Sequence, residues 1–479
     1  MGVISEKDLK LTRDPYSAEE RERIEIKLDG LLRELTQKII VIDDDPTGGQ
    51  TVNDVMVYAG WSVDTLAQAF ADERKMFYIL TNSRSMTEKE TAAIHGEIVA
   101  NIVQAAKTAG KAYLIISRGD STLRGHYPLE TRVLYDELAE KSGHAMDGEI
   151  LIPFFKEGGR FTIDDVHYLD NGERLIPVGQ SEFAGDRTFG YKSSDLKEWI
   201  EEKTKGAYPA DRVRSIPLSM LRRMDFDGIA EILLSVSSFD KVIVNSACYT
   251  DLKVFAIAFI QALRSGKRFL ARTAAGWPRV LGGIKNDVIL TRKELVKGEG
   301  KNGGLIVVGS HVRKTTAQLE QLRSTEKPVV FIEFNQHLAL ESSGLEQEAA
   351  RVAAEAGKSI REGKTAAIFT RRQRIDLGSG NPEEELKITK QIADAVTDVV
   401  RRLDATPEFI IVKGGITSSD IAVKALHAEK ALIRGQVYPG IPVWKLGENS
   451  RYPGIPYIVF PGNVGDADTL KKLAESLMY

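Results

Sequence analysis

The stretch LIISRGDSTLRGHYPLE, residues 114–130, decides the fold because a buried strand and a polar loop meet in it. The β-forming run from Tyr113 to Ile116 is typical of a buried parallel strand. Ligands of open α/β sheets bind at the carboxyl ends of the strands, so the stretch predicts an α/β fold with a ligand site at this edge. The polar residues that follow the strand are Ser117, Arg118, Asp120, Ser121, Thr122, Arg124 and His126.

This loop has the side chains that a small anionic polyol requires. The guanidinium groups of Arg118 and Arg124 match a carboxylate with two parallel hydrogen bonds, and Asp120 can accept hydrogen bonds from hydroxyl groups. The alternative is that Asp120 or Ser121 caps a helix that carries Leu129, in which case the arginines are only solvated. We favour the ligand site, because capping would use one residue and leave the others unexplained.

Two earlier strands predict further polar loops at the same edge. The strand Ile39 to Ile42 ends in DDDPTGGQT, where three adjacent carboxylates, Asp43, Asp44 and Asp45, repel one another unless cations or donors neutralise them. One of them could act as a general base or hold Mg²⁺ through water, although Asp-Pro and Thr-Gly are also ordinary turn residues. The strand Met76 to Leu80 is followed by Arg84. The three loops together predict a cleft.

The rest of the first half continues the alternation of strands and helices. The strand 149–154 is followed by Gly158, Gly159 and Arg160, which can bring backbone and a cation close to a ligand. A kink in the loop with a solvated arginine is an equal alternative. Asn171-Gly172 between two strand-like runs predicts a β-hairpin, which we interpret as a lid or a dimer contact. Arg268, Arg272 and Arg279 are interpreted as surface charges.

A polar, glycine-rich segment, LVKGEGKNGG at 295–304, separates this half from a second βα series. We predict two domains, 1–299 and 300–479, each with a mostly parallel sheet flanked by helices, and a β-hairpin extension in the first. The second domain has expected strands at 305–308, 329–333, 366–370, 409–412 and 457–460, and YPGIPVWKLG (438–447) is predicted to be a rigid loop.

Three turns of the second half combine glycines with hydroxyl groups directly after strands. Backbone amides in such turns, together with the dipole of a following helix, hold phosphate, so they predict a nucleotide site. The patterns GxxxxGK[ST] and GxSxG and any Cys/His cluster are missing from the sequence, which argues against a P-loop enzyme, a hydrolase and a zinc protein. The GxGxxG match at 298–303 lies before the expected strand 305–308 and not after a strand, which argues against a simple Rossmann dehydrogenase. The turns contain Ser310; Gly414, Gly415, Ile416 and Thr417; and Gly462, Asn463 and Gly465.

Composition excludes several other classes. The 65 Lys and Arg residues nearly balance the 68 Asp and Glu residues, so the chain has no electrostatic footprint for nucleic acid or for an anionic membrane. Cys248 is the single cysteine, which excludes a disulfide framework. No stretch has the apolar length of a signal peptide or a membrane span, and we expect a cytoplasmic protein.

Over nearly its whole length the chain resembles the four-carbon acid sugar kinase family. The first half is similar in the DD-x-TG loop (Asp44, Asp45, Thr47, Gly48), in Ser83-Arg84, in DSTLRG (120–125) and in the GGR segment that ends at Arg160. The second half is similar in Gly309-Ser310, Gly414-Gly415-x-Thr417 and Gly462-Asn463-x-Gly465. Many members have a lysine where this chain has Arg118-Gly119, and an acid where it has Ile416.

The resemblance implies ATP-dependent phosphorylation of the terminal hydroxyl of threonate, erythronate or a 3-oxo-tetronate, with Mg²⁺. It also implies an acid-sugar domain first and an ATP domain second, with catalysis between them. A kinase for another small hydroxy acid, such as 4-hydroxythreonine, and a non-catalytic acid-sugar sensor are the alternatives, and a homodimer through the hairpin near Asn171 is a hypothesis.

Within that function, each predicted site residue has an expected role. Asp44, Asp45 and Asp120 are expected to be catalytic. The expected substrate-binding residues are Arg84, Ser121, Thr122, Arg124 and Arg160, and the expected nucleotide-binding residues are Ser310, Gly414, Gly415, Ile416, Thr417, Gly462, Asn463 and Gly465.

Overall fold

The computed structural model describes residues 5–285, 288–296, 301–373, 382–462 and 464–479. Its contacts divide the chain into two units, Met1–Val52 with Gly60–Asn286, and Asn53–Ala59 with Asp287–Tyr479. The short segment 53–59 therefore groups with the C-terminal half, a long-range contact that local sequence patterns do not encode.

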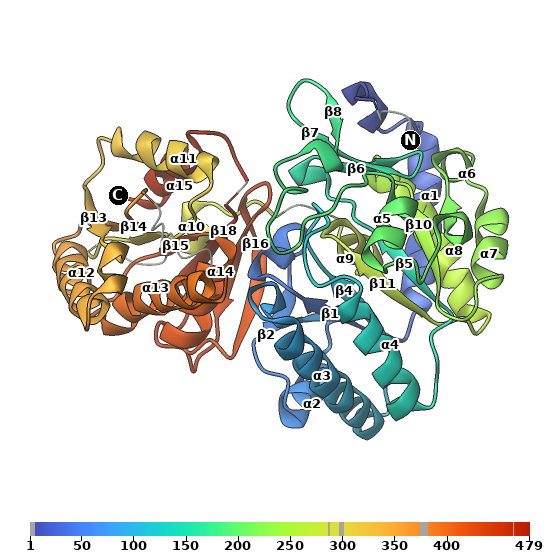
Figure 1. The fold of residues 1–479 in the computed structure, drawn as a ribbon, viewed down its shortest axis with the longest axis horizontal. Helices are drawn as coiled ribbons and strands as arrows, with labels where there is room; N and C mark the ends of the chain where they lie inside the picture. The colour runs from blue at the N-terminus through green and yellow to red at the C-terminus, as the bar shows by residue number, and fades with distance from the viewer. Residues whose placement is uncertain (1–4, 286–287, 297–300, 374–381, 463) are drawn as a thin grey trace. The chain divides into compact units, whose positions relative to one another are not determined.

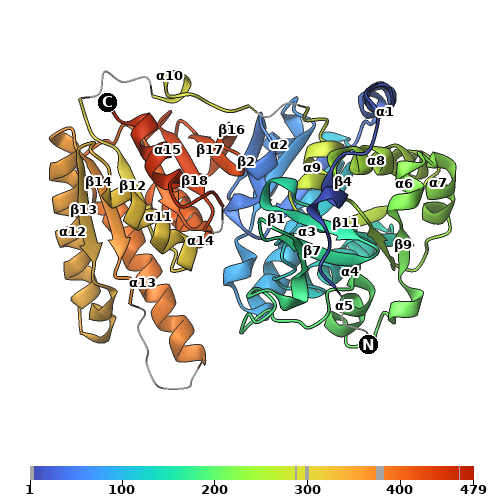
Figure 2. The same cartoon turned by 90° about the horizontal axis from the view of Figure 1, so that it is seen from above.

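The N-terminal unit is built on a parallel sheet with the strand order β3-β1-β4-β11-β5-β10-β9. Helices α8 and α9 lie on one face of this sheet and α3 and α4 on the other (Figures 1 and 2). The strands are β1 (Lys38–Asp43), β3 (Met76–Leu80), β4 (Tyr113–Arg118), β5 (Gly148–Ile152), β9 (Arg214–Ile216), β10 (Asp240–Val244) and β11 (Phe269–Thr273). The helices are α1 (Ala18–Glu34), α2 (Val63–Ala71), α3 (Glu88–Ala109), α4 (Leu129–Ser142), α5 (Leu196–Lys203), α6 (Leu218–Arg222), α7 (Phe226–Leu234), α8 (Tyr249–Arg264) and α9 (Gly276–Leu281).

Local sequence explains where these elements begin and end. Every residue of β1 is buried, as expected for a central parallel strand that is covered on both faces. Thr87 and Glu90 form a capping box at the start of α3, because each satisfies a free backbone N–H of the other, and Gly110 ends that helix in the left-handed conformation.

The predicted β-hairpin is present and belongs to a small antiparallel sheet with the order β6-β7-β8. The strands are β6 (Arg160–Ile163), β7 (Val166–Asp170) and β8 (Leu175–Pro177). The turn at Asn171 joins β7 to β8, as predicted, and a second hairpin through Asp164 and Asp165, both at positive φ, adds β6.

The C-terminal unit has a mixed sheet. Strands β13, β14, β12, β15 and β18 are parallel in that order, and β17, β16 and β2 continue it antiparallel. Helices α11 and α15 pack together, and α12 packs on α13. The strands are β2 (Val55–Tyr58), β12 (Leu305–Val308), β13 (Val329–Phe334), β14 (Thr365–Thr370), β15 (Ile410–Lys413), β16 (Lys430–Tyr438), β17 (Ile441–Leu446) and β18 (Pro456–Phe460). The helices are α10 (Arg292–Leu295), α11 (Arg313–Arg323), α12 (Gly344–Arg361), α13 (Pro382–Arg402), α14 (Gly415–Asp420) and α15 (Thr469–Leu477).

The prediction of a rigid loop at 438–447 is wrong. This segment is the turn and second strand of an antiparallel hairpin, β16 to β17, with Gly440 at positive φ in the turn. Pro442 suggested a loop, but it can occupy a strand position where the sheet needs no N–H donor, here opposite Gln436 next to a register shift.

Candidate functional site

The topology of the N-terminal sheet places two predicted loops side by side. Strand β1 lies between β3 and β4, so the chain leaves β1 on one side and returns on the other. The loops that follow β1 and β4 therefore start from neighbouring strand ends at the carboxyl edge of the sheet. The strand order reverses at β1, and open α/β sheets bind their ligands at such a point of reversal.

The acidic loop after β1 is neutralised by two arginines. The Arg84 guanidinium donates to both oxygens of Asp44, with Nη2 2.6 Å from Oδ1 and Nε 3.2 Å from Oδ2. Its Nη1 donates to Asp45 Oδ2 at 3.2 Å, and Arg118 Nη1 donates to Asp43 Oδ1 at the same distance. The cations that three adjacent buried carboxylates require are thus supplied by the loops after β3 and β4.

One carboxyl group of this loop, that of Asp43, has a pKa close to neutral pH. Burial, together with the charges of the adjacent Asp44 and Asp45, raises the pKa of Asp43 to about 7 against the opposing effect of Arg118. The loop therefore exchanges a proton in the physiological range, which is a property of functional sites.

The DSTLRG loop is organised around Asp120. Arg124 Nε donates to Asp120 Oδ2 at 2.7 Å, and Thr122 Oγ1 donates to the same oxygen. Burial alone would raise the pKa of Asp120, but Arg124 and Arg84 outweigh it and hold the pKa well below its usual range. The capping alternative is wrong, because α4 begins at Leu129 and its N-cap is Pro128.

Two residues that the sequence did not single out support this loop from behind. His167 Nε2, on β7, donates to the Ser121 carbonyl at 2.8 Å, and the Tyr191 hydroxyl donates to the Thr122 carbonyl at 2.6 Å. Burial lowers the pKa of His167 to about 4, so the ring is neutral at pH 7. Both residues are distant from DSTLRG in sequence, and no local pattern pointed to them.

The interpretation of Arg272 as a surface charge is also wrong. Strand β11 pairs with β4, so Arg272 lies behind the loop, where Nη1 donates to Glu130 at 2.6 Å and to Ser117 at 2.9 Å. Burial works against the charge on Glu130, but Arg272, helped by nearby hydrogen bonds, lowers the pKa of Glu130 to about 2. Arg279 is buried as well and pairs with Glu157, whereas Arg268 is exposed as expected.

A small cavity opens among these groups. Its volume is about 10 Å³, room for about one water-sized group. Two buried polar atoms of its lining residues, Thr273 Oγ1 and Trp199 Nε1, have no hydrogen-bond partner in the described ranges. Arg160 Nε is buried without a partner too, and burial lowers the pKa of that arginine to about 10. Unsatisfied buried polar atoms beside a charged cluster indicate a polar ligand. The cavity lining is Asp120, Leu123, Arg124, Leu151, Pro153, Trp199, Arg272 and Thr273.

In the C-terminal unit, the three predicted turns meet. Gly309 and Ser310 donate backbone N–H groups to the Lys413 carbonyl at 3.1 and 3.2 Å. A Cβ on Gly462 would lie 2.9 Å from Ser310 Oγ, and one on Gly309 would lie 2.2 Å from Thr417 Oγ1. Only glycine permits these approaches, so the backbone itself forms the surface of the site.

The charges around these turns are positive. Helix α11 has no side-chain N-cap, and its first turn holds Arg313 and Lys314 and no acid. Arg372 donates to the Ser310 carbonyl at 2.8 Å, and Lys413 is fully buried beneath. Cations at a helix N-terminus oppose the helix dipole, and an anion at that place relieves the conflict.

The remaining predicted residues of this site lie on or beside the same turns. Gly415 begins α14, Ile416 is exposed and Gly465 has positive φ. Asn463 lies outside the described residues. His311, which lies next to Ser310, bonds to the Arg371 carbonyl and to Thr370 Oγ1, each at 3.3 Å, which is a packing role.

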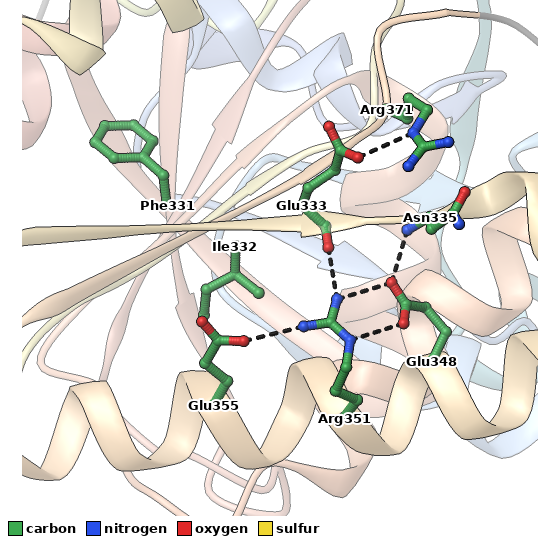
Figure 3. Close-up of a pocket in the computed structure, with 8 residues that line it drawn as sticks. All are labelled: Phe331, Ile332, Glu333, Asn335, Glu348, Arg351, Glu355 and Arg371. Atoms are coloured by element: carbon green, nitrogen blue, oxygen red, sulfur yellow. Dashed lines mark hydrogen bonds and ion pairs between the residues drawn. The ribbon is translucent and has the colours of Figure 1, made fainter.

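A larger pocket, about 340 Å³, lies elsewhere, between β13 and α12 (Figure 3). Its charged side chains pair with one another: Arg351 contacts Glu348 at 2.8 Å and Glu355 at 3.0 Å, and Arg371 contacts Glu333 at 2.9 Å. Its charges already have partners, unlike the buried polar atoms of the small cavity. Among the described residues, no group of three or more metal-ligating side chains was found, and no helix there is long and apolar enough to cross a membrane.

The sequence matches two family models, a sugar-binding N-terminal domain over residues 39–281 and a nucleotide-binding C-terminal domain over residues 305–470. The chain belongs to the four-carbon acid sugar kinase family and carries its sugar-binding and nucleotide-binding domains. No curated protein matches the sequence.

Solved structures share the fold at low sequence identity. A Haemophilus influenzae protein of the family designated DUF1537 is 18% identical, with a TM-score of 0.58, and a Salmonella typhimurium LT2 protein, provisionally described as a tRNA synthase, is 16% identical, with a TM-score of 0.64. In both cases 92% of this chain and 100% of the other chain are covered. A Bordetella bronchiseptica DUF1537 domain, crystallised with citrate as a domain-swapped dimer, is 18% identical over 92% of this chain and 98% of that chain, with a TM-score of 0.35.

Proposed function

We propose that the protein is an ATP-dependent kinase that phosphorylates the terminal hydroxyl of a four-carbon acid sugar, namely threonate, erythronate or a 3-oxo-tetronate. The observation that carries the proposal is the Asp120–Arg124 cluster with its neighbouring cavity, in a chain that has both a sugar-binding and a nucleotide-binding domain. We assign substrate binding to residues 1–299 and nucleotide binding to residues 300–479.

The arginines of the sugar-binding domain would hold the substrate carboxylate. Arg124 uses Nε for its hydrogen bond to Asp120, while Nη1 lies 3.7 Å from Asp186. The Nη groups can therefore donate hydrogen bonds to a substrate carboxylate. Arg160 and Arg84 add cationic charge near the same loop. Asp120, kept ionised by these arginines, accepts hydrogen bonds from substrate hydroxyls, and Ser121 and Thr122 supply further polar groups.

The acidic loop would handle the proton of the acceptor hydroxyl. Both oxygens of Asp44 are bonded to Arg84, whereas Asp45 receives one bond from Arg84 and one from the Thr47 amide. Asp45 is also the more exposed of the two, so we assign it as the base and Asp44 as the group that fixes Arg84. Phosphoryl transfer depends mainly on such alignment and charge compensation.

The turns of the nucleotide-binding domain fit a polyphosphate, because their glycines allow the backbone segments to approach closely and the cations Arg313 and Lys314 lie at the start of α11. Ser310, the 414–417 turn and the 462–465 turn would hold the phosphates. ATP supplies the phosphoryl group, and Mg²⁺ would be carried mainly by its phosphate oxygens, as Mg²⁺ commonly is in kinases.

The test is a coupled ADP-release assay with Mg-ATP across D- and L-threonate, D- and L-erythronate, the 3-oxo-tetronates and 4-hydroxythreonine. Turnover on a four-carbon acid sugar supports the proposal and identifies the substrate. Turnover on 4-hydroxythreonine alone would show that the acceptor belongs to another class of hydroxy acid. Silence across the panel, in a protein that binds acid sugars but no nucleotide, would favour a sensor instead.

A further inference from the structure

The sequence did not single out Lys413, the last residue of β15, although the structure places it at the centre of the three turns. It pairs in register with Phe460 on β18 and with Val308 on β12. Both neighbours belong to the core cluster beneath α11 and α15, so the Lys413 side chain lies on the face that these helices cover.

Within the described part of the chain, the Lys413 amine donates hydrogen bonds only to backbone carbonyls. Nζ donates to the Pro461 carbonyl at 2.6 Å and to the Gly462 carbonyl at 3.3 Å, and it lies 3.8 Å from the centre of the Phe460 ring. The Gly462 carbonyl also accepts from Thr315 Oγ1, whose side chain reaches Ser310. Lys413 thus ties the 462 turn to the start of α11.

This buried cation has no counter-charge. Across the described ranges, no carboxylate forms an ion pair with Lys413, and the charged side chain that affects it is another cation, Lys314 on α11. Burial, aided by the charge of Lys314, lowers the pKa of Lys413 to about 6. A lysine in this setting is mostly neutral at pH 7 until an anion arrives.

We propose that Lys413 is a positioning residue that takes up a proton when a nucleotide binds and then serves as the buried counter-charge of its phosphates. The inference rests on the proposed nucleotide site at the three turns. The bound phosphates stabilise the ammonium form, the proton comes from solvent, and the bonds to Pro461 and Gly462 hold the turn in the bound geometry.

The experiment is calorimetric titration of the full chain with ADP at about pH 8, where ADP is fully ionised, in two buffers of different ionisation enthalpy. The difference in heat gives the number of protons taken up. For the wild type we expect uptake of between about a half and one proton per ADP at about pH 8. The uptake should fall and turn into net release near pH 5, where Lys413 is already protonated and the terminal phosphate of ADP gives up its own proton on binding.

Lys413→Met should lose this uptake and bind ADP about 10 to 100 times more weakly, as expected for loss of one charged partner. Lys358→Met, which removes an exposed lysine on α12, is the control and should behave as the wild type. The pH series needs only the wild type, so a Lys413 variant that fails to fold does not prevent the test.

The possible failures are distinguishable. ADP binding without proton uptake at any pH would overturn the role of Lys413 and leave the nucleotide site intact. Uptake that persists in a folded Lys413→Met protein would assign the proton to another group and would overturn the inference as well. Absence of ADP binding by the wild type would overturn the proposed function itself.

Discussion

The sugar-binding domain and the nucleotide-binding domain differ in how their candidate sites are made. In the first, side chains of opposite charge pair around Asp44, Asp120 and Glu130, each with its own arginine. In the second, backbone turns approach closely at glycines, and the nearby cations are Arg313, Lys314 and Lys413. The first arrangement suits a small ligand that carries both hydroxyls and a carboxylate, and the second suits a polyanion.

The largest expected effect is a loss of turnover when the charged cluster of the sugar-binding domain is changed. Asp120→Asn removes the charge that Arg124 and the substrate hydroxyls share, so turnover should fall about 10²- to 10⁴-fold, the cost of breaking a buried, hydrogen-bonded charge pair. Steady-state kinetics measure it. Asp136→Asn, at an exposed pair on α4, is the control, and equal losses in both variants would show that Asp120 has no special role.

The next prediction concerns the stability of the paired site. Glu130→Gln leaves the buried Arg272 without a counter-charge and should lower the free energy of unfolding by about 3 to 5 kcal/mol in a urea titration. The matched control is Glu137→Gln on the same helix, where the exposed pair with Lys141 is expected to contribute less than about 1 kcal/mol. Similar losses of stability in both variants would contradict the claim that the buried pair contributes more than the exposed one.

A smaller effect is expected in the backbone site. Gly414 has φ +127°, and a Cβ there would lie 3.3 Å from the Cβ of Ser310. Gly414→Ala should cost about 1 to 3 kcal/mol of strain, and the KM for ATP should rise more than the KM for the acid sugar. Gly30→Ala in α1, where no atom lies within 4 Å of the new Cβ, should leave both constants unchanged. An unchanged KM for ATP in Gly414→Ala would remove this turn from the site.

The smallest effect depends on pH. The pKa of His167 in the folded protein, about 4, is below that of an unfolded histidine, so its contribution to stability is complete above about pH 6.5 and is lost as the pH falls toward 4. His167→Gln should lack this dependence, and the difference between the two proteins should reach about 1 to 2 kcal/mol near pH 5 in thermal unfolding. Parallel pH profiles would mean that His167 does not titrate on unfolding.

The same contrast explains what the sequence could predict. The sequence predicts the strand ends and the loops DDDPTGGQT and DSTLRG, because the polar side chains of each loop directly follow the end of one strand, where α/β sheets bind ligands. The roles of Arg272 and His167 depend on the pairing of β11 with β4 and on the β7 hairpin, which are long-range contacts. Lys413 was missed because a lysine at the end of a strand looks solvated until α11 is seen to cover it.

The hairpin of β16 and β17 was missed for a related reason. Pro439 and Pro442 are typical of loops, and only the antiparallel neighbours β2 and β18 show that this segment completes a sheet. Local patterns therefore predicted the parallel cores and the loops of the candidate site, but not the strands whose partners come from distant parts of the chain.

The most direct test of the divided site is a crossed titration. Wild type, Asp120→Asn and Gly414→Ala are each titrated by calorimetry with ADP and with the acid sugar that the ADP-release assay identifies. We predict that Asp120→Asn loses the acid sugar and keeps ADP, and that Gly414→Ala weakens ADP and keeps the acid sugar. If either folded variant lost both ligands, or lost the opposite one, the assignment of acid sugar to the first domain and nucleotide to the second would be contradicted.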